Sequence, residues 1–124
     1  MEAFSFGLGQ LLKEMTQEVE VFVLGLTAVD EHVMPFAGCL WYSNSQIAAM
    51  EAVMAEQCRE ADVPFLPMHQ EMQEEPDWLT WMEPDGIHLN ADGHRWLDQL
   101  LDQWAPLREW AGLAPVNTST PISM

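Results

Sequence analysis

The stretch Glu20-Val21-Phe22-Val23-Leu24-Gly25-Leu26 decides the fold of this chain. It is a nearly continuous apolar run of strand length, which is typical of a strand buried on both faces of a parallel sheet. A second and shorter apolar run, Val63 to Pro67, has the same character. Because parallel strands need a crossover between them, the two runs predict an α/β arrangement with a helix in their connection.

Helical patterns lie before, between and after the two apolar runs. The first pattern covers Phe4 to Thr16, and the second begins at Ser43 and Asn44, whose side chains can cap a helix. The third begins at Asn90, another capping residue. The inward residues expected for the second helix are Ile47, Met50, Met54, Cys58 and Ala61, and those for the third are Trp96, Leu97, Leu100, Leu101 and Trp104.

These elements predict one folded domain over residues 1–114, followed by a flexible tail over residues 115–124. Thr27 to Tyr42 is expected to be a long connection, and Gln70 to Pro84 a loop with one short helical turn. Trp78 and Trp81 within the second loop admit two interpretations. They either offer a broad apolar surface to a substrate or pack in the core.

Asp85-Gly86-Ile87-His88 places a carboxylate and an imidazole in one tight bend. A histidine that deprotonates a hydroxyl needs a group to fix its tautomer and to stabilise the imidazolium, and an aspartate can do both. The same pair can also be a structural hydrogen bond that closes a turn. His88 and Asp85 are therefore candidate catalytic residues with a structural alternative.

The serines do not complete a catalytic triad. Ser43 and Ser45 are explained by helix capping and Ser5 by an exposed helical position. None lies in a strand-turn-helix context that would expose it as a nucleophile. The sequence thus predicts a base and its orienting acid without the group that they would activate.

The residues from Asp85 through Leu89-Asn90-Ala91-Asp92-Gly93-His94 resemble the last conserved block of the SGNH/GDSL esterases and acylhydrolases. Leu89 stands where that block usually has proline. The resemblance continues backward through Val63 to Pro67, Tyr42 to Ile47 and Val21 to Leu26, and it covers roughly the first 105 residues. It implies the C-terminal portion of a three-layer flavodoxin-like SGNH-hydrolase fold, with about two parallel strands and three or more helices.

The resemblance also implies that two parts of the family's catalytic site are missing from the chain. The family's blocks that hold the serine nucleophile and the oxyanion-hole donors have no counterpart here, so we expect the chain alone to be inactive. With a complementing N-terminal half, His88 and Asp85 would serve hydrolysis of a small acyl ester or thioester. The alternative is a non-catalytic remnant or interaction module that associates with itself or another chain through an exposed sheet edge.

Composition excludes several other functions. Four Lys and Arg against twenty Asp and Glu give a formal net charge of -16, which disfavours nucleic acid and anionic membrane surfaces. The apolar runs are too short to span a bilayer. The residues after Met1 lack the features of a signal peptide, so a cytoplasmic location is the default expectation. Cys39, Cys58, His32 and His69 show no metal-ligand spacing; we expect Cys58 to be a buried free thiol, and no metal or cofactor.

Overall fold

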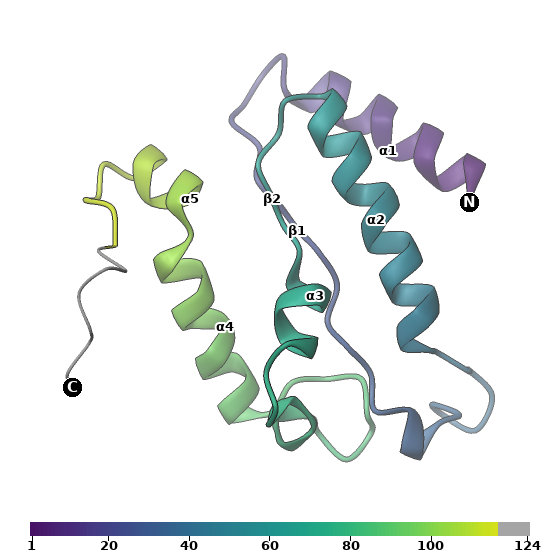
Figure 1. The fold of residues 1–124 in the computed structure, drawn as a ribbon. Coiled ribbons are helices and arrows are strands. Elements are labelled where there is room, and N and C mark those ends of the chain that lie inside the picture. The colour runs from purple at the N-terminus through teal and green to yellow at the C-terminus, as the bar shows by residue number, and fades with distance from the viewer. Residues whose placement is uncertain (117–124) are drawn as a thin grey trace.

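Two parallel strands form the centre of the molecule. The computed structural model describes residues 1–116 of the 124-residue chain. Strand β1 (Val23–Leu24) pairs in parallel with β2 (Phe65–Leu66), with Val23 opposite Phe65 and Leu24 opposite Leu66. Helices α1 and α2 lie along one flank of the strands and α4 along the other (Figure 1). The predicted parallel pairing with a helical crossover is confirmed.

The three long helices occur where the sequence predicts them. They are α1 (Glu2–Met15), α2 (Asn44–Glu60), which is the crossover between the strands, and α4 (Ala91–Gln103). Both predicted caps form, because the Ser43 hydroxyl accepts the Gln46 amide at 3.2 Å and the Asn90 side chain accepts the Gly93 amide at 2.9 Å. Local capping chemistry thus fixes where the helices on either side of the sheet begin.

The strands are shorter than the apolar runs that predict them. The runs from Glu20 to Leu26 and from Val63 to Pro67 are each of strand length, yet only two residues of each form the ladder. The cause is the pair of prolines in the second run, since proline has no amide hydrogen to donate. Pro64 still accepts the Val23 amide at 3.0 Å, but Pro67 ends the strand and begins the next helix.

The segment from Gln70 to Pro84 holds more helix than one short turn, and that prediction was wrong. Helix α3 (Met68–Gln73) starts directly after β2, and the 3₁₀ turn η2 (Trp78–Trp81) follows it. The long connection after β1 contains a further 3₁₀ turn, η1 (Glu31–Val33). The sequence predicts Trp104 in the last helix, but the helix breaks at that residue and a separate α5 (Ala105–Trp110) follows, with Pro106 in its first turn.

The core consists of two clusters on opposite sides of the strands. The first joins α1 to α2 and β2 around Leu12, Cys58 and Val63, which confirms the prediction that Cys58 is a buried free thiol. The second joins α3, η2 and α4. Its buried residues are Ala28, Met72 and Leu89, with Trp78, Trp81, Met82, Trp96 and Leu97 packed against them.

The second cluster settles how the loop tryptophans are used. The rings of Trp81 and Trp96 stack with their centroids 5.2 Å apart, and Trp78 packs on the same cluster. Core packing therefore accounts for Trp78 and Trp81, and the same cluster contains Met82 and Leu89, which flank the Asp85–His88 bend.

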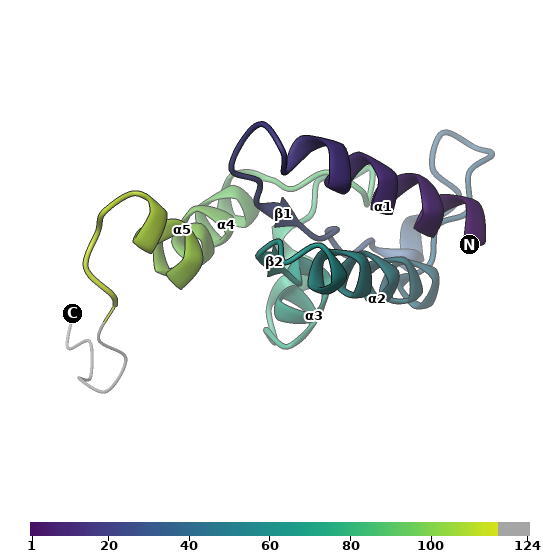
Figure 2. The same ribbon diagram turned by 90° about the horizontal axis from the view of Figure 1, so that it is seen from above.

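Seen from above, α4 and α5 extend away from the α1–α2 pair (Figure 2). No helix in residues 1–116 has both the length and the apolar character needed to cross a membrane. The predicted tail over residues 115–124 lies mostly outside the described residues.

Candidate functional site

Asp85 organises the bend that carries His88. One carboxylate oxygen, Oδ1, accepts the backbone amides of Ile87 and His88, each at 3.0 Å. The other, Oδ2, lies 2.5 Å from the Nδ1 atom of His88. Gly86 takes a φ of 79°, a left-handed conformation that glycine adopts without strain. The two side chains are thus in contact within one bend, as the sequence predicts.

The same hydrogen bonds set the charge of the pair. The Ile87 amide, followed by the His88 ring and the His88 amide, lowers the pKa of Asp85 to about 2. Asp85 is therefore ionised at neutral pH, and its Oδ2 favours the tautomer of the His88 ring that carries the proton on Nδ1. The Nε2 atom of His88 is then left with a free lone pair, as a general base requires.

The His88 side chain is open to solvent and lines a groove. About 67% of the His88 side chain is exposed, so a hydroxyl group from outside the bend can reach it. The groove has a volume of about 720 Å³. Its lining residues are Thr27, Glu83, Pro84, Asp85, Ile87, His88, Leu89, His94 and Leu97.

Thr27 places this groove at the carboxyl end of β1, the position where open α/β sheets gather functional groups. Thr27 lines the same groove as His88, although sequence reasoning considered only serines. The signal available in the sequence was its place directly after the first apolar run. Thr27 is thus a groove-lining residue that the sequence analysis missed.

The bend is held at both of its ends. The amide of Glu83 donates to the carbonyl of His88 at 2.8 Å, which closes the bend on itself. Beyond it, Met82 and Leu89 form an antiparallel bridge, and the Asn90 side chain donates to the Thr80 carbonyl at 2.8 Å while capping α4. The start of α4 therefore fixes the exit of the bend.

The other candidate residues lie elsewhere. Ser43 caps α2 and Ser5 accepts a hydrogen bond from Gln57 at 2.8 Å, and neither lines the groove of His88. His94 sits in the first turn of α4 at the rim of the groove. His32 pairs with Asp30 at 2.9 Å, and no cluster of three or more metal-ligating side chains occurs within residues 1–116.

Sequence reasoning also missed a polar cluster in which the half-buried Asn44 joins the buried side chains of Glu51 and His69. Only 5% of Glu51 and 4% of His69 is exposed, and Asn44, expected to act in helix capping, directs its side chain to the segment after β1. A signal for Glu51 was present in the sequence. This acidic residue stands on the otherwise apolar stripe of α2, four residues after Ile47 and three before Met54.

Comparison with known proteins gives a family match over most of the chain. Residues 2–96 match the model of the GDSL-like lipase/acylhydrolase family, a range that includes both strands, the groove and the bend. No curated protein matches the chain.

Proposed function

Because the chain belongs to the GDSL-like lipase/acylhydrolase family, we propose that it serves esterase- or lipase-type hydrolysis, with His88 as general base and Asp85 as the residue that orients it. The observation that supports this assignment is the contact between His88 Nδ1 and Asp85 Oδ2 in a bend that exposes the ring to a groove. The substrates proposed are small acyl esters.

The chemistry follows from the orientation of the ring. His88 Nε2 takes the proton of a serine hydroxyl as its oxygen attacks the ester carbonyl, and the imidazolium is stabilised by Asp85. The same proton then passes to the leaving alcohol as the C–O bond breaks, which leaves an acyl-serine. Water deprotonated by His88 releases the acid and restores the serine.

The proposal includes a nucleophile and oxyanion-hole donors supplied by another segment or chain. It is supported by the positions of Ser5 and Ser43, which are engaged in contacts remote from the groove. Loss of an oxyanion-hole donor alone typically lowers the rate by about a hundred- to a thousand-fold. We therefore propose that these 124 residues are inactive by themselves.

The test is hydrolysis of a short-chain nitrophenyl ester by the chain alone and by the chain mixed with a complementing N-terminal half of this family. We expect background rates from the chain alone and hydrolysis from the mixture. His88→Ala should lower the rate of the mixture by about a hundred- to ten-thousand-fold, whereas Ser43→Ala should leave it unchanged. Equal rates for the wild type and His88→Ala would remove His88 from the mechanism.

A second candidate function is that of a non-catalytic module that pairs with another chain. Two observations favour it. Leu24 turns its backbone N–H and C=O away from β2, because the Val23 and Gly25 amides on either side donate to that strand. Large apolar side chains of α1 and the following turn are exposed, including Phe6 at 69% and Val19 at 56%.

A further inference from the structure

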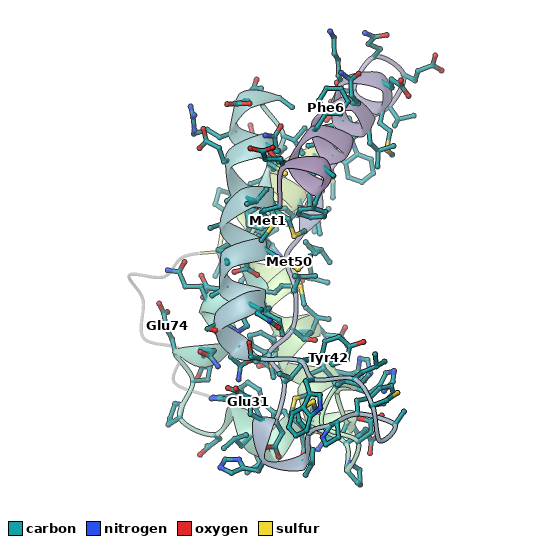
Figure 3. The ribbon with its side chains drawn as sticks, turned by 90° about the vertical axis from the view of Figure 1, so that its right-hand side faces the viewer. Met1, Phe6, Glu31, Tyr42, Met50 and Glu74 are labelled. Atoms are coloured by element: carbon teal, nitrogen blue, oxygen red, sulfur yellow. The ribbon has the colours of Figure 1, made fainter. Side chains whose placement is uncertain are left out.

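The side chain of Asn44 forms hydrogen bonds with the backbone of the segment that follows β1. Its Oδ1 accepts the amide of Val29 at 2.9 Å, and its Nδ2 donates to the carbonyl of the same residue at 2.8 Å. One carboxamide thus pairs with both the N–H and the C=O of Val29, as the backbone of a neighbouring strand would. Nδ2 also donates to Glu31 at 3.1 Å, and Glu31 lies beside the lower end of α2, far from Phe6 (Figure 3).

Two buried side chains hold Asn44 in place. The Nε2 atom of His69 lies 3.2 Å from Asn44 Oδ1, and burial lowers the pKa of His69 although the carboxylate of Glu51 opposes this. The ring is therefore neutral and donates its proton to Asn44. Glu51 in turn accepts the backbone amides of His69 at 2.8 Å and Leu26 at 3.0 Å, which ties together the carboxyl ends of both strands.

The segment fixed in this way is the support of the bend. The amide of Asp30, the residue after Val29, donates to the carbonyl of Gly86 at 2.9 Å. Gly86 also packs against the same segment so closely that a Cβ atom there would lie 2.3 Å from a methyl carbon of Val33. A continuous set of contacts therefore runs from Asn44 through Val29 and Asp30 to the middle of the bend.

We propose that Asn44 is a positioning residue for the His88–Asp85 pair, with Glu51 and His69 as its buried support. The inference rests on the proposed function of that pair and adds a residue that touches neither member of it. The hydrogen bonds between Asp85 and His88 are exposed and compete with water. The network around Asn44 contains two buried side chains, and no buried polar side-chain atom within residues 1–116 lacks a partner, which favours rigidity. A general base must be held to within a fraction of an ångström, and the network adds to the support that the two ends of the bend provide.

The experiment measures the pKa of Asp85 by carbon-detected NMR titration of the full chain, in the wild type and in Asn44→Ala. Gln57→Ala is the matched control, because Gln57 lies on the same helix and also makes a side-chain hydrogen bond to another element, at 2.8 Å to Ser5. We expect Asn44→Ala to raise the pKa of Asp85 by about one pH unit, since the bend loses its support. Gln57→Ala should leave that pKa unchanged. Equal values in all three proteins, or equal shifts in both variants, would overturn the proposal.

Amide hydrogen exchange in the wild type provides a measurement that needs no variant to fold. If Asn44 supports the bend, the amides of Val29 and Asp30 should exchange with the same protection, because they open together. Fast exchange of Asp30 beside a protected Val29 would contradict the proposal. Neither measurement requires hydrolysis, so a failed positioning role leaves the esterase proposal intact, and absent hydrolysis leaves the positioning result standing.

Discussion

At the scale of single residues, the bend depends on a glycine that meets two requirements at once. Gly86 has a φ of 79°, and its neighbours leave no room for a side chain, because a Cβ atom there would lie 3.1 Å from the Asp30 carbonyl oxygen and 3.3 Å from the Met34 methyl carbon. Gly38 has a φ of 77° and open space around it. A side chain at Gly38 would therefore cause backbone strain alone, whereas a side chain at Gly86 would cause both backbone strain and steric overlap.

We predict that Gly38→Ala lowers the free energy of unfolding by about 1–2 kcal/mol, the cost of a left-handed non-glycine residue. Gly86→Ala should cost more, because the added methyl group also collides with Val33 and displaces the bend. Urea unfolding followed by tryptophan fluorescence measures both. Equal losses would mean that the bend can move away from Val33 without penalty.

The pKa of Asp85 gives a prediction about pH. Because folding lowers this pKa from 3.8 to about 2, the folded state binds the proton less readily than the unfolded state. The stabilisation by Asp85 is therefore complete above about pH 4 and is lost as the pH falls towards 2. We expect Asp85→Asn to be less stable than the wild type at pH 6, with the difference shrinking steadily on acidification. A difference that stays constant from pH 6 to pH 2.5 would contradict the proposed hydrogen bonding of the carboxylate.

The contact between Asp85 and His88 could be predicted from the sequence because both side chains and the amides that Asp85 accepts lie within four consecutive residues. Asp85 bonds to amides two and three positions ahead, which is the ordinary behaviour of aspartate in a turn. The role of Asn44 could not be predicted in the same way. Its partner Val29 lies fifteen positions away, and the capping preference of an asparagine at a helix start explained its presence without that contact.

At the scale of elements, the side chain of Asn90 joins the start of helix α4 to the 3₁₀ turn η2. Asn90 caps the helix by accepting the Gly93 amide, and it also donates to the carbonyl of Thr80 in η2. Ser43, in contrast, caps α2 with a single hydrogen bond to the Gln46 amide. The comparison separates an ordinary cap from a cap that also joins two elements.

We predict that Asn90→Ala lowers the free energy of unfolding by about 1–2 kcal/mol and Ser43→Ala by about 0.5–1 kcal/mol. Asn90→Ser should recover part of the loss, since serine restores the cap but cannot reach Thr80. Chemical unfolding of the three variants checks the order. A loss for Ser43→Ala equal to that for Asn90→Ala would show that the contact with Thr80 contributes nothing.

The long helices were predictable because their periodicity and caps are local, and the short elements were not. Helix α3 has six residues and no side-chain cap from its own segment. Its first amides, those of His69 and Gln70, are instead satisfied by Glu51 from α2. This cap is a tertiary contact, and the residues next to Met68 in the sequence give no sign of it.

At the scale of the whole molecule, the net charge of -16 opposes association of two copies, whereas the exposed edge of β1 favours it. Charge repulsion between copies is screened within about 10 Å at 0.1 M salt, but backbone pairing at a sheet edge is not weakened by salt. Salt should therefore shift the balance towards pairing.

We predict that the chain associates more strongly as salt rises from about 0.01 M to about 0.5 M, the range over which the screening length falls from about 30 Å to a few ångströms. Sedimentation velocity of the full chain measures the mean mass at each salt concentration. Leu24→Lys places a charge on the proposed edge and should keep the protein monomeric at high salt. Leu79→Lys is its matched control, because Leu24 is 38% and Leu79 43% exposed and both changes add the same charge, but Leu79 lies on η2 away from the edge. Association unaffected by Leu24→Lys, or lost equally in both variants, would show that copies meet through another surface and that the β1 edge is not the pairing site.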